Sequence, residues 1–329
     1  MGARRVTAVD VARRAGVAVS TVSYILNDAP GQTFTPATKD RVHAAVRELG
    51  YVPSAAARAL RQGRSHNVLM LLPDMGIGEA LAHVVDRLSD AMDQHGYSVV
   101  FRRSRAGRSA TALVAELAPA AVVALARLTP DEVAGLESAG VPLVQDVGGR
   151  DGITDREVLQ ADIGRAQAQH LLDLGHRRLV YGAPDDERLE PLARNRVAGV
   201  LATTRQAGLP DPDVVPVPLD ADAAADVVRA WLDASEPPTA VCAYNDLVAL
   251  AVLAGAARHG VACPADLAVV GVDDVVAARL SVPPLTTVDF HPDELTAELT
   301  EVLLDRLLAR PAEPRTSWTG VELVRRGST

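Results

Sequence analysis

The chain has 329 residues, of which 48% are hydrophobic and 23% charged, and its formal net charge is −9. This length allows two or three hydrophobic cores, no apolar run reaches the roughly 18 residues that would span a bilayer, and the amino terminus offers no signal-peptide core, which favours a cytoplasmic protein. Cys242 and Cys263 form no CxxC pair and the eight histidines are scattered, so we expect no disulfide, metal site or cofactor.

Charge is distributed unevenly along the chain. Residues 1–65 carry ten basic and four acidic side chains, a net charge of +6, whereas the rest carries 23 basic and 38 acidic ones, a net charge of −15. A compact basic module joined to an acidic body is the arrangement expected if only the first part meets a polyanion. A chance cluster of surface charge is the alternative.

Residues 6–49 predict three short helices. The first has an apolar stripe of Val9, Ala12 and Ala15 and ends at a turn at Gly16-Val17. The second, Val19–Asn27, buries Val22, Ile25 and Leu26 and lines up four polar side chains at helical spacing, namely Ser20, Ser23, Tyr24 and Asn27. The third opens with an N-cap and proline at Thr35-Pro36 and runs to about Leu49, before Gly50.

The next segment, SAAARALRQGRS at residues 54–65, begins with seven residues of high helix propensity. Seven residues are too few for a stable isolated helix, because nucleation is costly and about 12–15 are usually needed. We therefore expect the segment to order only against a partner. A simple tether rich in Ala and Arg is the alternative.

From Val68 onward, apolar runs alternate with amphipathic helices such as Glu79–His95. This alternation predicts parallel sheets covered on both faces, arranged as two α/β lobes. The predicted strands are Val68–Leu72, Ser98–Phe101, Ala121–Leu125 and Leu143–Val147 in the first lobe, and Arg178–Tyr181, Val214–Val217, Ala240–Ala243 and Ala268–Gly271 in the second.

Ligands of open parallel sheets bind outside the carboxyl ends of the strands. Those ends carry Asp74, Arg102, Arg103, Arg127 and Asp146 in the first lobe, and Asn245, Asp246, Asp273 and Asp274 in the second. Carboxylates and guanidinium groups suit a small polyhydroxylated or anionic molecule. Simpler interpretations stay open, since Asn245, Asp273 and Asp274 could cap helices and Arg102 and Arg103 could be a solvated strand end.

Several motifs together resemble the lactose-repressor (LacI/GalR) family. They are VTAVDVARRAGVAVSTVSYILND, TPATKDRVHAAVRELGYVPSAAARAL, HLLDLGHRRLVY, RNRVAGV, AYNDLVALAVL, DLAVVGVDD, PPLTTVDF and VELVRRGST, in family order over nearly the whole chain. The resemblance implies a multidomain regulator with an all-α helix-turn-helix headpiece and a two-lobed α/β domain like a periplasmic binding protein. The implied domains are a headpiece at residues 1–53, a hinge helix and linker at 54–65 with the helix at 54–60, and an effector-binding and dimerisation domain at 66–329. The lobes of that last domain are expected at about 66–158 plus 290–315 and about 159–289 plus 316–329.

The same resemblance implies a homodimer on a near-palindromic operator. Base contacts are expected from Val19, Ser20 and Tyr24, phosphate contacts from Thr21, Ser23 and Asn27, and hinge contacts from Ser54, Ala57 and Leu60, the last wedging into the minor groove. Arginine is common in the family at the Tyr24 position, where it would read guanine in a bidentate contact that tyrosine cannot make. We further hypothesise that the hinge folds only on operator binding.

The resemblance implies effector contacts at Asp74, Asp146, Arg196, Asn245 and Asp273. Arg127, at a strand end of the first lobe, is a further candidate on the charge of its side chain. The chain departs from the family at Met75–Glu79, Val200 and Val272, where aromatic residues are common, and only 3% of its residues are aromatic. Stacking platforms for a sugar ring are therefore scarce. The scarcity of aromatic residues, together with arginines at the first lobe's strand ends, favours an effector carrying phosphate or carboxylate over a neutral sugar. The expected effector is thus a sugar, a phosphorylated sugar or another small metabolite.

Two other functions fit the sequence less well. A two-lobed solute-binding protein is disfavoured by the basic amino-terminal module and the missing signal peptide. An enzyme is disfavoured because GxSxG, GxxxxGK and complete GxGxxG motifs are absent, and Gly76-Ile77-Gly78 alone is weak evidence. The chain ends without a heptad segment that would assemble tetramers, so a dimer is expected.

Overall fold

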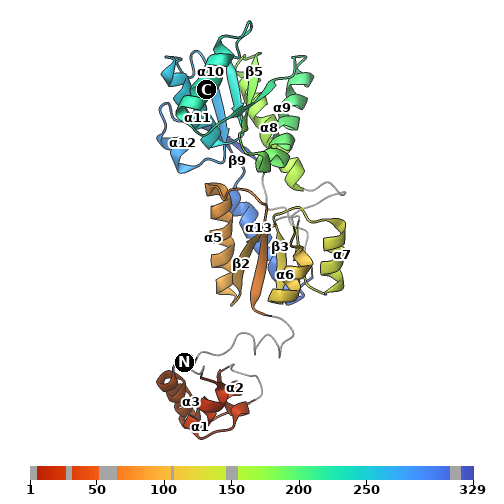
Figure 1. Ribbon diagram of the computed structural model, residues 1–329, viewed down its shortest axis with the longest axis vertical. Helices are drawn as coiled ribbons and strands as arrows, with labels where there is room; N and C mark the ends of the chain where they lie inside the picture. The colour runs from red at the N-terminus through yellow and green to blue at the C-terminus, as the bar shows by residue number, and fades with distance from the viewer. Residues whose placement is uncertain (1–5, 27–31, 52–64, 105–106, 146–154, 312–319) are drawn as a thin grey trace. The chain divides into compact units, whose positions relative to one another are not determined.

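The computed structural model describes residues 6–26, 32–51, 65–104, 107–145, 155–311 and 320–329 (Figure 1). It divides into two compact units, Met1–His66 and Asn67–Thr329. Within the described residues, no helix is both long enough and apolar enough to cross a membrane.

The described part of the first unit is a bundle of three helices, α1 (Ala8–Ala15), α2 (Val19–Leu26) and α3 (Pro36–Leu49). Each helix contributes one fully buried valine to the centre of the bundle, namely Val11, Val22 and Val42. The predicted stripe of α1 was wrong at one position, because Val9 is 50% exposed and Val11 faces the core. Val11, Ala12 and Ala15 follow the i, i+1, i+4 spacing of one helix face.

The ends of α3 confirm the predicted stop and start signals. The Thr35 hydroxyl accepts a hydrogen bond from the Thr38 backbone N–H at 3.3 Å, and Pro36 is the first helical residue. Gly50 has a φ of 61°, a left-handed conformation that favours glycine. These caps fix the length of α3 and thereby the surface on which α2 packs.

The second unit begins with a parallel four-stranded sheet in the order β2-β1-β3-β4. Its elements are β1 (Asn67–Leu72), α5 (Glu79–Gln94), β2 (Ser98–Arg103), α6 (Ala110–Leu117), β3 (Ala121–Ala124), α7 (Pro130–Ser138) and β4 (Leu143–Val144). Alternate side chains of β1 enter two different cores. Val68, Met70 and Leu72 pack with α5 and α13 (Pro292–Leu308), while Leu69 and Leu71 pack with α6 and α7. This sheet and its helices form the first lobe.

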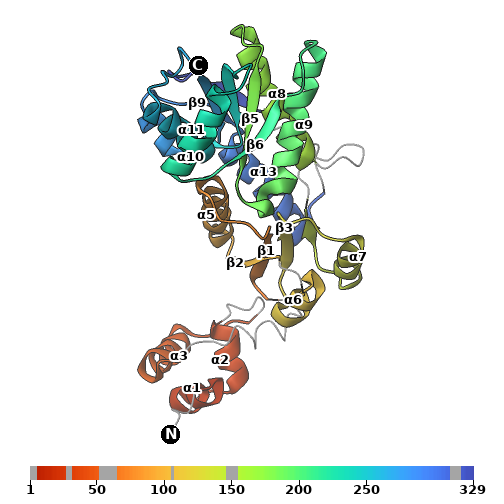
Figure 2. The same cartoon turned by 45° about the horizontal axis from the view of Figure 1, so that its top comes forward.

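The second lobe contains a six-stranded sheet in the order β10-β9-β8-β7-β5-β6. Its strands are β5 (Leu179–Pro184), β6 (Asp213–Val217), β7 (Ala240–Ala243), β8 (Ala268–Val272), β9 (Thr286–Asp289) and β10 (Glu322–Val324). Figures 1 and 2 show α8 (Asp155–Asp173) and α9 (Glu190–Gln206) on one face, and α10 (Ala221–Leu232) and α11 (Asp246–Arg258) on the other.

One strand departs from the predicted parallel arrangement. β10 pairs with β9 in the antiparallel sense, with Leu323 opposite Val288. It follows α13, which packs in the first lobe, so the chain returns to the second lobe through β10 rather than through a parallel strand–helix–strand crossover. Strand–helix alternation in the sequence does not reveal such a return.

Candidate functional site

The exposed side of α2 is the first candidate site. Val19, Ser20 and Tyr24 are exposed, whereas Thr21 and Ser23 are half-buried beside the buried Val22 and Ile25. The helix contains no charged residue, so its outward groups are hydroxyls and apolar atoms. It lies in the amino-terminal half of residues 1–65, which carry a net positive charge. Short hydroxyl side chains and helix amino ends are common contacts to nucleic-acid phosphates.

The Tyr24 ring is oriented by a second aromatic ring. It stacks on Phe34 with the ring centroids 6.4 Å apart and the planes 22° apart. Tyr24 is 40% exposed, so part of the residue remains accessible to a partner. Of the other residues predicted to contact DNA, Asn27, Ser54, Ala57 and Leu60 lie outside the described residues.

The second candidate site is the Arg196 cluster, made of Gln160, Arg196, Tyr244, Asn245 and Asp273. These residues come from α8, α9, the loop between β7 and α11, and the loop after β8. The β7 and β8 members stand at the carboxyl ends of adjacent parallel strands, which is where ligands of such sheets bind. The structure thus brings together three of the predicted effector residues: Arg196, Asn245 and Asp273.

Arg196 is buried, at 6% exposure, and its guanidinium interacts with three neighbouring residues. Its Nε donates to the Gln160 Oε1, one Nη1 proton is donated to the Tyr244 carbonyl oxygen, and the guanidinium lies 4.5 Å from the centroid of the Tyr244 ring. Its Nη2 is 3.9 Å from the Asp273 Oδ1. That separation is within ion-pair range but too long for a direct hydrogen bond.

The charge balance around Asp273 is unusual. Burial raises the pKa of its carboxyl to about 6, Arg196 opposes this rise, and Asp289 and Glu79 add to it. A buried guanidinium therefore faces a carboxylate that is itself crowded by negative charge. The 3.9 Å gap can be bridged by a hydroxyl group that accepts from Arg196 and donates to Asp273.

The neighbours of the cluster resolve the capping alternatives. The Asn245 Oδ1 accepts from the Val248 N–H at 3.0 Å and so caps α11, as the alternative predicted. Asp273 and Asp274 do not cap α12 (Val276–Leu280), whose N-cap residue is Val275. Asp274 instead accepts hydrogen bonds from Arg279 and Arg326.

Asp246, which directly follows Asn245, is a structural anchor. It is fully buried and accepts hydrogen bonds from the Thr287 hydroxyl at 2.6 Å and from the Val275 N–H at 2.9 Å. Burial raises the pKa of its carboxyl to about 7. A Cβ at Gly271 would stand 2.1 Å from the Asp246 Oδ1, so the glycine leaves the space that this carboxylate occupies.

The predicted residues of the first lobe are placed less tightly. Asp74 follows β1 and is half-buried, and its charge acts on Arg188 of the second lobe. Arg127 is exposed just beyond β3. Arg102 and Arg103 end β2 opposite Leu71 and Leu72. Asp146 lies outside the described residues.

Two members of the Arg196 cluster, Gln160 and Tyr244, were not predicted from the sequence, and neither was the helix crossing that positions them. α8 and α9 meet at two glycines: a Cβ at Gly164 would stand 2.0 Å from the Arg196 carbonyl oxygen, and one at Gly199 would stand 2.0 Å from the Ala161 carbonyl oxygen. Glycines inside helical segments are the sequence signal for such close backbone contact.

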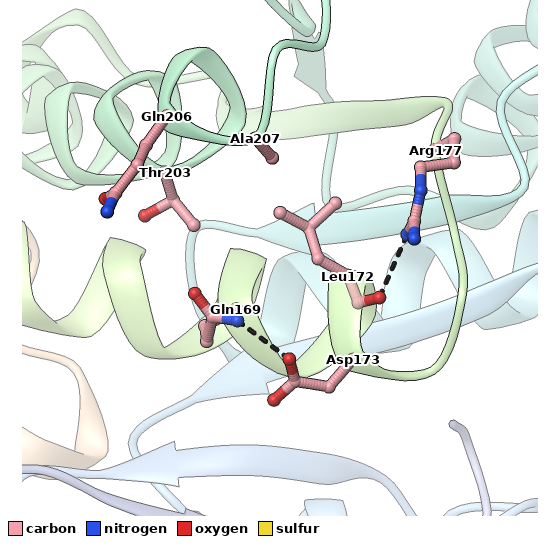
Figure 3. A pocket seen from close by; sticks show the side chains of 7 residues that line it. All are labelled: Gln169, Leu172, Asp173, Arg177, Thr203, Gln206 and Ala207. Atoms are coloured by element: carbon pink, nitrogen blue, oxygen red, sulfur yellow. Dashed lines mark hydrogen bonds between the residues drawn. The ribbon is translucent and has the colours of Figure 1, made fainter.

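A separate hollow of about 340 Å³ lies between the carboxyl-terminal ends of α8 and α9 (Figure 3). It is near the start of β5, at the amino ends of the strands, whereas the Arg196 cluster lies at their carboxyl ends. Several of its polar groups bond to one another, since Gln169 donates to Asp173 at 2.7 Å and Arg177 donates to the Leu172 carbonyl oxygen at 2.9 Å. It therefore offers a ligand less than the Arg196 cluster does.

Comparison with known proteins matches both units. Residues 7–54 match the model for bacterial regulatory proteins of the lacI family, and residues 168–329 match a periplasmic binding protein-like domain. The HTH-type transcriptional regulator CelR of Thermobifida fusca is 32% identical over 327 residues, covering 94% of each chain.

Two solved structures are similar over 99% of this chain. One is the lac repressor dimer bound to operator and the anti-inducer ONPF, with 25% identity, a TM-score of 0.79 and coverage of 99% of that chain. The other is the complex of the transcriptional regulator CelR with cellobiose, with 27% identity, a TM-score of 0.66 and coverage of 100% of that chain.

Proposed function

This chain belongs to the lacI family of bacterial regulatory proteins, and we propose that it represses transcription by binding a near-palindromic operator through α2 under the control of a small hydroxyl-rich effector. Family membership makes it a DNA-binding transcriptional regulator acting in the cytoplasm, rather than an enzyme or a solute-transport protein. The observation that carries the effector proposal is the buried Arg196 guanidinium facing Asp273 across 3.9 Å.

The chemistry at Asp273 favours a neutral effector group at this point of the site. Glu79 and Asp289 already raise the pKa of Asp273, so a phosphate or carboxylate placed beside it would be repelled. A sugar hydroxyl meets no such repulsion and satisfies both Arg196 and Asp273. The CelR–cellobiose complex, whose ligand is a disaccharide, is consistent with this class.

An effector that also carries an anionic group is the second candidate. It is favoured by the arginines at the carboxyl edge of the first sheet, Arg102, Arg103 and Arg127. Calorimetry with a panel of sugars and their phosphates decides between the two. If the phosphate of an effector raises affinity in the native protein but not in Arg127→Ala, the anionic group is assigned to Arg127. If Arg127→Ala leaves the affinity for the phosphorylated effector unchanged, that arginine is excluded.

The operator proposal is tested with the full-length protein and DNA from its own promoter region. Footprinting across the same panel of metabolites reports the site, its symmetry and the effector together. We expect a protected near-palindrome whose occupancy changes with one member of the panel. A protein that binds a sugar but protects no DNA would refute the repressor proposal.

We also propose that the chain acts as a homodimer, as the lac repressor of the operator complex does. Support comes from exposed apolar side chains gathered around α12, where Leu280 is 76% and Val282 93% exposed. Such exposure is typical of surfaces covered by a partner. Sedimentation should show a dimer for the native chain and a monomer for Leu280→Asp, and a native monomer or tetramer would contradict the proposal.

A further inference from the structure

The amino-terminal end of α12 receives hydrogen-bond acceptors from both lobes. Its N-cap residue, Val275, has no polar side chain with which to cap the helix. The Val275 N–H is instead donated to Asp246 of the second lobe at 2.9 Å, and the Val276 N–H is donated to the Glu79 Oε1 at 3.3 Å. Glu79 begins α5, which packs in the core of the first lobe.

Glu79 also acts on the Arg196 cluster. The Val276 N–H that is donated to Glu79 lies three residues after Asp273 in the chain, so the Glu79 carboxylate stands near the loop that carries Asp273. In agreement with this placement, burial raises the pKa of Asp273 and the charges of Asp289 and Glu79 add to the rise, against the effect of Arg196. Two opposing forces therefore meet at Glu79. Its bond to the Val276 N–H holds the lobes together, and repulsion from Asp273 pushes them apart.

We propose that Glu79 is a positioning residue that couples the proposed effector site to contact between the lobes, by capping α12 across the lobe boundary with a strength set by the charge on Asp273. An effector hydroxyl that donates to Asp273 draws off part of its negative charge and so strengthens the Glu79 cap. By linkage, the cap strengthens effector binding by the same factor. Glu79 acts on Asp273 through the electrostatic field of its carboxylate. The regulatory meaning of this contact rests on the proposed function, whereas the contact itself does not.

Amide hydrogen exchange in the ligand-free, full-length protein tests the contact. The measured quantity is the exchange rate of the Val276 amide divided by that of the Val275 amide, which is bonded to Asp246 within one lobe. This ratio cancels the general effect of removing a nearby charge. In Glu79→Ala it should rise about fivefold, the effect of losing a typical helix cap.

Three further variants separate capping from charge. Glu79→Gln keeps an acceptor oxygen and removes the repulsion, so its ratio should equal or fall below the native value. Asp273→Asn should lower the ratio, because only the repulsion is lost. Asp90→Ala, an exposed position on the same helix, should leave it unchanged.

An unchanged ratio in Glu79→Ala, or an equal rise in Glu79→Gln, would overturn the cap. A ratio in Asp273→Asn that does not fall would overturn the role of its charge. Since no ligand is used, failure of these tests would leave the proposed effector site standing, and failure to find an effector would leave the exchange result standing.

Discussion

The crossing of α8 and α9 makes Gly199→Ala a demanding test of the proposed site. The added Cβ would stand 2.0 Å from the Ala161 carbonyl oxygen and 2.9 Å from its carbonyl carbon. Ordinary contacts of a Cβ begin near 3.4 Å, so the helices must separate by more than 1 Å. The obstructing atoms are backbone, which cannot rotate away as a side chain does.

The expected loss of stability follows from two opposing effects. Overpacking costs about 1–3 kcal/mol, and a clash with backbone atoms places this substitution at the upper end, about 3 kcal/mol. Replacing glycine by alanine inside a helix returns about 1 kcal/mol. The net loss is about 2 kcal/mol. For a unit of this size, about 2–4 °C of Tm accompanies each kcal/mol, so the Tm of the second unit should fall by about 4–8 °C.

Thermal unfolding followed by circular dichroism measures this change. Ala202→Ser, on the exposed side of the same helix, is the control and should shift the Tm little. Separation of the helices also moves Arg196 away from Gln160, so affinity for the effector should fall. A Gly199→Ala protein with a higher Tm than the native chain would refute the reasoning, since it would show that helix propensity outweighs the clash.

Three other changes are predicted. Burial raises the pKa of Asp246 to about 7, above an unfolded value near 3.9. The protonated Asp246 carboxyl therefore contributes fully to stability below about pH 4, and this contribution is lost as the pH rises through 7. Asp246→Asn should flatten the fall in Tm between pH 4 and pH 8, and an unchanged slope would contradict this prediction. Arg196→Lys removes the planar donors that engage Gln160 and Tyr244 and should weaken effector binding at least about tenfold by calorimetry, as a loss of about 1.4 kcal/mol would. Tyr24→Phe keeps the stacking on Phe34 but loses the hydroxyl, so binding assays with operator variants should show altered preference at one base pair in each half-site, whereas Thr21→Ala should weaken all variants equally.

Much of the architecture is local and could be predicted from the sequence. The caps of α3 at Thr35 and Gly50 depend on residues within one turn of each helix end, and both are present. The strand at Ala121 was predictable because a parallel strand buried on both faces is a continuous apolar run. β10 was not predictable as antiparallel, since its direction depends on where α13 packs.

Adjacent residues at the strand ends show a second limit. Asn245 and Asp246 follow the same strand, as do Asp273 and Asp274, and all four are short polar residues. In the structure Asp246 is fully buried, while Asp273 faces Arg196 and Asp274 is bonded to Arg279 and Arg326. Composition cannot divide these roles, because they depend on which neighbouring element supplies a partner.

Arg196 shows why the proposed effector site could not be predicted from the strand ends alone, without the crossing of α8 and α9. It lies in the middle of α9, two residues from Arg194, and the rule that ligands bind at strand ends selects neither. Side chains of residues i and i+2 on a helix point about 200° apart, so only one of the two arginines can face α8. Arg194 is exposed and paired with Glu190, whereas Arg196 is buried against Gln160. The close approach at Gly164 and Gly199 decides this orientation, and it makes Arg194→Lys the matched control for Arg196→Lys: the same chemical change on the same helix should leave effector affinity as it is.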